Sequence, residues 1–299
     1  MEHRLRRSWL LTPASSPEKL AAAIKSAADV AVLDLVEFVV ERCKPAAREH
    51  MSAALREVEA AGKEAYAHDD AQLLYADLHA SVWPGLAGVV ISRAETTEQI
   101  KEADQVLTHL EAERGLLPGT VRIVVACETA RGNHAAYELA TASRRVWGLT
   151  LGRADLIMDL RPEPSTEIHM MQYLMQRLIT IAGAVGATPL GAWWRAPDRG
   201  LLATPDNTLQ AARRGRAIGF RGALCVREDQ VSSLNQGFTP SPDEEHAATR
   251  LLAAYDTATI AGNAVLRQDD RLFDRGTARC ARSLLDLAAA CKPPLAMSS

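Results

Sequence analysis

Eight short apolar runs alternate along this chain with longer segments of helical composition, and this alternation restricts the folds that the chain can adopt. The apolar runs lie at residues 9–13, 30–35, 63–68, 88–93, 121–128, 146–152, 189–194 and 222–226. Helices are expected near residues 17–28, 45–61, 71–82, 95–113, 131–143, 165–185 and 204–218. Apolar runs that are bounded by turns and separated by helices indicate parallel strands buried on both faces. Eight such runs predict a closed α/β barrel of the (β/α)8 type rather than an open doubly wound sheet.

Proline-containing helix starts support these boundaries. Ser16-Pro17-Glu18 and Thr204-Pro205-Asp206 each place a capping residue, a first-turn proline and an acid in order. The predicted barrel domain covers residues 1–240. Residues 241–299 form a predicted C-terminal helical extension that serves as a lid or as an arm exchanged between subunits. Its last helix, at 275–291, is amphipathic, which predicts a homo-oligomer. A trimer or a multiple of one is the expected assembly, although the helix itself does not set the number of subunits.

The composition argues against several classes of function. The net charge of -3 gives no reason to expect nucleic acid or an anionic membrane as partner. The 5 cysteines are scattered and not in CxxC spacing, so neither a disulfide framework nor a zinc site is indicated. The sequence shows no signal peptide and no apolar run of membrane length, which predicts a cytoplasmic protein.

Two carboxylates follow consecutive predicted strands. Glu128 ends the run at 122–128, and Asp155 follows the run at 146–152 after a turn at Gly152. In a parallel barrel both carboxylates would point into the mouth where such proteins keep their chemistry. Mg²⁺ is a hard cation that accepts few protein ligands and keeps water or substrate oxygens in its other positions. Glu128 and Asp155 therefore predict a Mg²⁺ site, with Mn²⁺ as the alternative ion.

Six motifs in a fixed order carry a family resemblance. They are Arg7-Ser-Trp-Leu-Leu-Thr-Pro13; Val32-Leu-Asp34-Leu-Val-Glu37 with Lys44 and Ala47-Arg48; Cys127-Glu128-Thr129; Gly152-Arg-Ala-Asp155-Leu; Gln230, Asn235, Phe238 and Pro240; and the segment 262–274. From Arg7 to about residue 290, the chain resembles the citrate lyase β-subunit-like branch of the HpcH/HpaI aldolase family.

The resemblance implies a Mg²⁺-dependent barrel that makes or breaks a carbon–carbon bond beside a carbonyl. Substrates of the family include acyl-CoA thioesters such as malyl-CoA or citramalyl-CoA, and 2-oxo acids. The resemblance implies Glu128 and Asp155 as metal ligands, and Asp34 and Glu37 as residues that hold metal-bound water or orient the ligands. It also implies that a neighbouring subunit's arm brings Asp274 to the site as a proton-transfer group.

Some positions near the predicted mouth differ from the family pattern. Val36 stands where the family has an acid, and the Arg-x-Asn of the third strand is missing from residues 64–68. Three other arginines are candidates for binding the substrate carboxylate, since a guanidinium suits that geometry: Arg7, Arg93 and Arg153. For Arg7 and Arg93, a salt bridge inside the barrel is the alternative.

Two further candidates carry alternatives of their own. His68 lies in the altered third strand and is expected either to contact substrate as a general base or to be a buried, hydrogen-bonded histidine. Glu37 is expected either at the site or as an acid at a helix N-terminus.

The predicted function is a Mg²⁺-dependent carbon–carbon lyase or aldolase that acts through a metal-stabilised enolate. Its substrate is a small oxo or hydroxy acid, free or as a CoA thioester. One alternative is a thioester hydrolase or condensing enzyme on the same scaffold, which product analysis distinguishes from a lyase. Another alternative is a catalytically silent barrel with a binding role, which metal content distinguishes from both enzymes.

Overall fold

The chain forms two compact units. The computed structural model describes residues 4–152, Leu156, Asp159, 170–193, 204–268 and 271–292. The first unit, here called the barrel unit, comprises Arg6–Gly237, and the second, here called the arm, comprises Phe238–Ser299 with Met1–Leu5.

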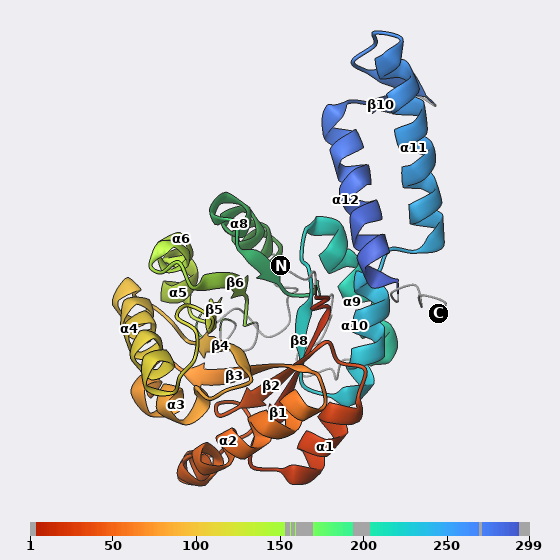
Figure 1. The fold of residues 1–299 in the computed structure, drawn as a ribbon. Coiled ribbons are helices and arrows are strands. Elements are labelled where there is room, and N and C mark those ends of the chain that lie inside the picture. Colours follow the sequence, from red (N-terminus) through yellow and green to blue (C-terminus); the bar gives the residue numbers. More distant parts are fainter. Residues whose placement is uncertain are drawn as a thin grey trace. The chain divides into compact units, whose positions relative to one another are not determined.

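The barrel unit is built around eight parallel strands (Figure 1). In chain order they are β1 (Ser8–Pro13), β2 (Val30–Asp34), β3 (Glu64–Asp70), β4 (Leu86–Ser92), β5 (Arg122–Ala126), β6 (Val146–Thr150), β7 (Thr188–Leu190) and β8 (Ala223–Cys225). Their order in the sheet is β7-β6-β5-β4-β3-β2-β1-β8. The Gly191 N–H donates to the Gly222 carbonyl at 2.7 Å and the Arg221 N–H to the Pro189 carbonyl at 3.0 Å. These two bonds join the outer edges and close the sheet, so the predicted (β/α)8 barrel is confirmed.

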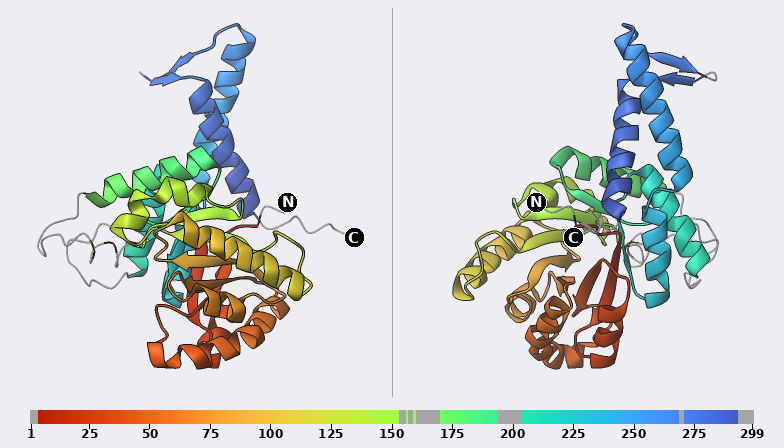
Figure 2. Two further views of the ribbon diagram at one scale, coloured as in Figure 1. Left: turned by 90° about the vertical axis from the view of Figure 1, so that its left-hand side faces the viewer. Right: turned by 45° about the vertical axis from the view of Figure 1, so that its right-hand side comes forward.

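Helices surround these strands (Figure 2). They are α1 (Pro17–Lys25), η1 (Glu41–Cys43), α2 (Lys44–Ala60), α3 (Leu74–Ser81), α4 (Thr97–Glu113), α5 (Ala130–His134), α6 (Ala136–Thr141), α8 (Met170–Val185), α9 (Pro205–Ile218), η2 (Glu228–Gln230) and α10 (Val231–Phe238). The predicted caps are confirmed, since Ser16 accepts from the Lys19 N–H at 3.4 Å and Thr204 from the Asn207 N–H at 3.2 Å. The single helix expected at 131–143 is instead two helices, and α10 was not expected.

The arm consists of two helices and a hairpin. Its elements are α11 (Pro242–Ile260), β9 (Leu266–Gln268), β10 (Arg271–Phe273) and α12 (Arg275–Cys291), and β9 and β10 pair antiparallel. Helix α12 packs along α11, and Lys292 Nζ lies 2.7 Å from Glu245 Oε2. The leucines of the predicted amphipathic face are half-buried in this unit: Leu284, Leu285 and Leu287. Part of that face is therefore covered within the chain itself.

Aromatic and aliphatic side chains fill the barrel interior. The interior cluster comprises Trp9, Leu11, Val30, Val32, Tyr66, Val90, Val124, Ala126 and Leu190. The ring centroids of Trp9 and Tyr66 lie 4.6 Å apart, and those of Trp9 and Trp147 lie 6.1 Å apart. A β-carbon at Gly88 would lie 2.4 Å from the Tyr66 ring, so glycine makes room for this packing. Because the interior is packed, a ligand has to bind where the strands end.

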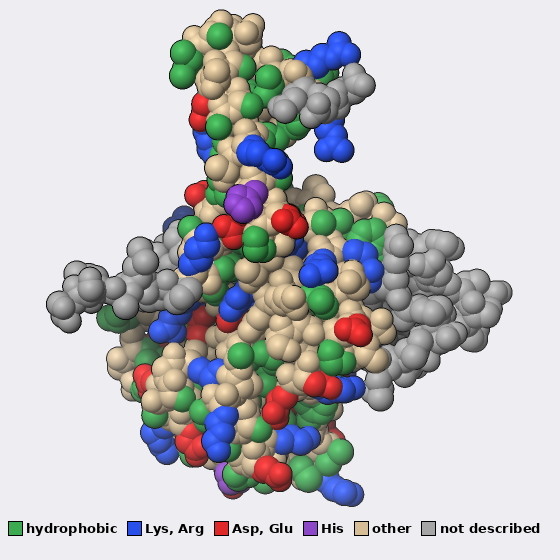
Figure 3. Space-filling model, turned by 90° about the vertical axis from the view of Figure 1, so that its right-hand side faces the viewer, with side chains coloured by type: hydrophobic (Ala, Val, Ile, Leu, Met, Phe, Trp, Pro, Cys, Tyr) green, Lys and Arg blue, Asp and Glu red, His purple; other side chains and the backbone are tan. Residues whose placement is uncertain are grey.

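The surface carries a mixture of side chains. On the face drawn in Figure 3, Lys and Arg side chains are interspersed with Asp, Glu and hydrophobic ones. Among the helices that the structure describes, none is both long and apolar enough to cross a bilayer.

A group of charged side chains is buried behind β3, against α2 and α3. The Arg48 Nε donates to Asp77 Oδ1 at 2.8 Å, and Asp77 Oδ2 accepts from the Asp70 N–H at 3.0 Å. Ser81 Oγ donates to Asp69 Oδ1 at 2.9 Å, while Asp69 Oδ2 is buried without a hydrogen-bond partner among the described residues. Burial, with the negative charge of Asp77, raises the pKa of Asp69 to about 8.

We expect Asp69→Asn to make the protein more stable at alkaline pH. An unfolded aspartate has a pKa of about 3.9, so the folded chain binds this proton more tightly than the unfolded chain does. The stability linked to Asp69 is therefore complete below about pH 4 and is lost as the pH rises toward the folded value of about 8. Urea unfolding at pH 6 and pH 9 should show that Asp69→Asn gains about 1 kcal/mol or more over the wild type at the higher pH. An identical pH dependence in the two proteins would contradict this assignment.

Candidate active site at the mouth of the barrel

A histidine and an aspartate form a buried pair at the carboxyl ends of β2 and β3. The sheet register places Asp34 opposite His68, and the His68 Nδ1 lies 2.8 Å from Asp34 Oδ1. Asp34 is 0% exposed and His68 is 2% exposed. Because Nδ1 is held by the carboxylate, the ring orientation is fixed and Nε2 is the nitrogen left for other partners.

The loop after β2 holds the Asp34 carboxylate in place. Its oxygens accept the backbone N–H groups of Val36 at 3.2 Å, Glu37 at 3.1 Å and Phe38 at 2.7 Å. Burial alone would raise the pKa of Asp34, but His68 and the N–H groups of Phe38 and Glu37 hold it below its ordinary value. Burial alone would lower the pKa of His68, but Asp34, followed by Glu128 and Glu37, raises it above its ordinary value. Each member of the pair therefore favours the charged form of the other.

Arg93 begins the turn after β4 and reaches back to the end of β3. Its backbone φ is +53°, the only positive value among the non-glycine residues that the structure describes. Its guanidinium donates to Asp70 Oδ2, and the buried Lys44 Nζ lies 3.7 Å from the same oxygen. Arg93 is thus at the mouth and forms an ion pair with Asp70, which is the salt-bridge alternative given for this residue.

Glu128 lies at the end of β5, against the end of β6. The Arg93 backbone N–H donates to Glu128 Oε2 at 3.2 Å. A β-carbon at Gly152 would lie 2.2 Å from Glu128 Cγ, so the carboxylate side chain rests on this glycine. Glu128 is 9% exposed. Its predicted companion Asp155, and Arg153, lie outside the described residues.

The structure does not bring Arg7 to the mouth. Arg7 directly precedes β1, and its Nε and Nη2 bind the Asp29 carboxylate at 2.8 and 2.9 Å, at the amino-terminal end of the strands. This placement corrects the expected position of Arg7. Because the strands are parallel, the residues that directly precede them lie at the end of the barrel opposite the mouth.

The remaining candidates lie in different settings. Glu37 is exposed in the loop after β2 and interacts electrostatically with His68. Asp274 is exposed in the arm and caps α12, where its Oδ1 accepts the Thr277 N–H at 2.9 Å. This bond lowers the pKa of Asp274. Its role in proton transfer stays a prediction.

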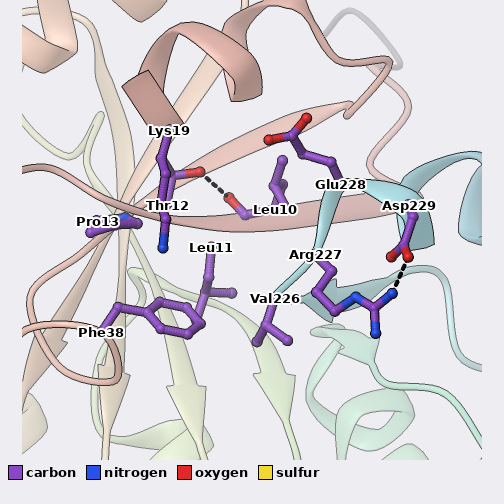
Figure 4. A pocket seen from close by; sticks show the side chains of 10 residues that line it. All are labelled: Leu10, Leu11, Thr12, Pro13, Lys19, Phe38, Val226, Arg227, Glu228 and Asp229. Atoms are coloured by element: carbon purple, nitrogen blue, oxygen red, sulfur yellow. Dashed lines mark hydrogen bonds and ion pairs between the residues drawn. The ribbon is translucent and has the colours of Figure 1, made fainter. Parts of the chain in front are cut away.

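A pocket of about 320 Å³ opens beside the ends of β1 and β8 (Figure 4). It is lined by Leu10, Leu11, Thr12, Pro13, Lys19, Phe38, Val226, Arg227, Glu228 and Asp229. Lys19 comes from α1 and its Nζ lies 5.8 Å from the centre of the Phe38 ring. Arg227 is paired with Asp229. The pocket therefore combines an apolar wall with an ammonium group.

Sequence analysis gave no site role to three side chains of this region. Ser92 is 0% exposed at the end of β4, and Asp70 and Lys44 form the ion pair described above. The signal for Ser92 is the alternation along β4, which puts it on the same face as the interior residue Val90. Within the described residues, no three His, Cys, Asp or Glu side chains gather as a metal-binding group. Glu128 is thus the one predicted metal ligand that the structure describes.

A closed barrel with polar side chains at the carboxyl ends of its strands is the scaffold of a (β/α)8 enzyme. Residues 7–228 of this chain match the model of the HpcH/HpaI aldolase/citrate lyase family, and the chain belongs to this family.

Three relatives illustrate what the chain is similar to. The citrate lyase subunit beta of Leuconostoc mesenteroides subsp. cremoris is 24% identical over 288 residues, covering 95% of this chain and 94% of the relative. The (3S)-malyl-CoA thioesterase of Cereibacter sphaeroides is 28% identical over 279 residues, covering 90% and 89%. The crystal structure of Mycobacterium tuberculosis CitE with magnesium, acetoacetate and coenzyme A has a TM-score of 0.74 at 24% identity, covering 97% of this chain and 100% of that one.

We expect Asp34→Asn to lower the pKa of His68. The substitution removes the charge that outweighs the effect of burial on the imidazole, while the amide oxygen can still accept the Nδ1 hydrogen. Titration of the His68 ring signals by NMR would measure the change, with His50, an exposed histidine on α2, as internal reference. An unchanged His68 pKa in the folded variant would contradict the electrostatic role given to Asp34.

Proposed function

We propose that this chain is a Mg²⁺-dependent carbon–carbon lyase that acts on a small oxo or hydroxy acid, free or as a CoA thioester. The observation that carries the proposal is the Glu128 carboxylate, held at the mouth by the Arg93 N–H and resting on Gly152. Membership of the HpcH/HpaI aldolase/citrate lyase family supports a lyase of this type.

The donor chemistry at this place fits Mg²⁺. Glu128 offers carboxylate oxygens, and Mg²⁺ needs only one or two protein carboxylates because it keeps several waters. We assign Glu128 as one ligand and Asp155, on the segment after Gly152, as the other. When bound, Mg²⁺ would supply the positive charge that stabilises an enolate formed beside the broken bond. Mn²⁺ accepts the same oxygen donors.

The other mouth residues position and polarise the reactants in this proposal. Asp34 fixes the ring of His68, so Nε2 can meet a substrate oxygen in one orientation. Arg93 fixes Glu128 through its backbone and keeps its guanidinium beside Asp70. Asp274, supplied by the arm of a second copy, is our proposed second proton-transfer group. That role requires a homo-oligomer.

The pocket beside β1 and β8 supports a thioester substrate. It lies at the same end of the barrel as Glu128 but on other strands, so one extended molecule can reach both. Its apolar wall and the Lys19 ammonium suit the coenzyme A part of a thioester, which is long and bears phosphate groups. We assign this pocket to the part of the substrate that lies beyond the reacting carbons.

A thioesterase is the second candidate, favoured by the resemblance to the (3S)-malyl-CoA thioesterase. The two reactions of malyl-CoA give different products. A lyase yields glyoxylate and leaves the thioester intact in acetyl-CoA, whereas a hydrolase yields malate and a free CoA thiol. Parallel carbonyl and thiol assays on malyl-CoA and citramalyl-CoA therefore distinguish them. A chain that binds Mg²⁺ but gives neither product with any thioester or oxo acid would favour a binding role.

We expect Glu128→Gln to abolish tight Mg²⁺ binding without unfolding the chain. The amide keeps the size of the side chain but removes the negative charge that a hard cation requires. Calorimetric titration with Mg²⁺ measures the loss, and Glu138→Gln, which changes an exposed acid on α6, is the matched control. Equal Mg²⁺ affinity in Glu128→Gln and wild type would remove Glu128 from the metal site.

We expect Lys19→Ala to weaken binding of acyl-CoA roughly tenfold while leaving binding of oxalate unchanged. The ammonium lies in the pocket, where it would pair with a phosphate of coenzyme A, and a charged hydrogen bond contributes about 1.5–3 kcal/mol. Lys25→Ala, in the last turn of the same helix, is the control because Lys25 does not line the pocket. Unaltered acyl-CoA affinity in Lys19→Ala would leave the pocket without its assigned ligand.

A further inference from the structure

Three polar atoms near the ends of β3 and β4 have no hydrogen-bond partner in the part of the chain that the structure describes. Ser92 Oγ and Arg93 Nε are buried without one. For His68, the hydrogen bond found is the one that Nδ1 makes to Asp34, and Nε2 makes none there. Buried polar atoms normally have hydrogen-bond partners. Atoms without partners that lie close together in the sequence and in the sheet therefore indicate that a ligand supplies those partners.

The sheet places these residues on neighbouring strands and facing inward. The register pairs His68 with Val90 and Asp70 with Ser92. Tyr66 and Val90 belong to the interior cluster, and side chains two residues apart in a strand share a face. His68 and Ser92 are therefore the next inward-facing residues above that cluster, toward the mouth.

The hydrogen-bond donors at this place suit an anion. The Arg93 guanidinium and the Lys44 ammonium share Asp70, and Lys44 Nζ also lies 3.2 Å from Oε2 of Glu41, an exposed residue. Asp34 is occupied by three backbone N–H groups and by His68, whose pKa is raised. With Nδ1–H bound to Asp34, a protonated ring directs its second N–H away from that carboxylate. The hydroxyl of Ser92 and the Nε–H of Arg93 are also donors.

We propose that His68 Nε2, Ser92 Oγ and Arg93 Nε form an anion subsite that receives a carboxylate of the substrate. This inference rests on the proposed function. The subsite adjoins Glu128 through the Arg93 backbone N–H, which donates to Glu128 Oε2 at 3.2 Å. A small oxo acid bound there places its carboxylate against the donors of β3 and β4 and its reacting oxygen toward Glu128. In this arrangement, β3 contributes to anion binding through the side chain of His68.

Ser92→Ala tests the subsite, because the inference predicts opposite effects on stability and on binding. Removing a hydroxyl that has no hydrogen-bond partner among the described residues should leave the melting temperature unchanged or raise it. The same change should weaken binding of oxalate, titrated calorimetrically at saturating Mg²⁺, by roughly tenfold. His68→Gln should weaken oxalate binding at least as much.

Ser81→Ala is the matched control. Ser81 is also a fully buried serine, but its hydroxyl donates to Asp69 behind β3 and away from the mouth. We expect Ser81→Ala to lower the melting temperature and to leave oxalate affinity unchanged, the reverse of Ser92→Ala.

The outcomes separate this inference from the proposed function. Wild-type affinity for oxalate in both Ser92→Ala and His68→Gln would overturn the subsite and leave the Mg²⁺ site standing. A Ser92→Ala protein that loses stability as well as affinity would assign the hydroxyl a structural role, which also overturns the subsite. A wild-type protein that binds no oxalate in the presence of Mg²⁺ would overturn both the proposed function and the subsite that rests on it.

Discussion

All eight strands of the barrel run in the same direction, and this parallel pairing decides where the functional side chains lie. A residue at the end of a strand reaches the mouth, and a residue that precedes a strand reaches the opposite end. Asp34 and His68 meet because they occupy paired positions at the ends of β2 and β3. Arg7 precedes β1 and meets Asp29, which precedes β2. The same pairing therefore explains one ion pair at the mouth and another at the far end.

The barrel separates an apolar interior from a polar mouth within a few residues of each strand. On β3, Tyr66 packs against Trp9, and His68, the next inward-facing residue, binds Asp34. Burying the charges beyond that point is costly unless they are paired. The ion pairs of Asp70 with Arg93 and Lys44 meet this requirement. Because neighbouring strands and α2 supply the partners, the position of each charged group depends on the pairing of β2, β3 and β4 and on the packing of α2.

The sequence was sufficient to predict the barrel, since eight apolar runs separated by helices leave few other arrangements. It was also sufficient to expect Glu128 at the mouth, because this residue follows a buried parallel strand. The end of β3 was missed, because Asp69 and Asp70 look like loop residues until Ser81 and Arg93 are known to pair with them. The Arg93–Asp70 contact depends on the backbone turn at Arg93. No sequence pattern indicated the positive φ of this residue. Arg7 was expected at the mouth because of its motif. It precedes β1, however, and therefore lies at the opposite end of the barrel.

One loop links the two parts of the mouth to which we assign ligands. The Phe38 backbone N–H donates to Asp34 Oδ2 at 2.7 Å, while Phe38 also lines the pocket beside β1 and β8. Lys19, whose Nζ lies 5.8 Å from the centre of that ring, belongs to the same pocket. A ligand that shifts the Phe38 backbone therefore alters a hydrogen bond to the carboxylate that orients His68. Asp34 accepts hydrogen bonds from the loop and binds the imidazole, so one carboxylate contacts both the loop beside the pocket and the histidine at the mouth.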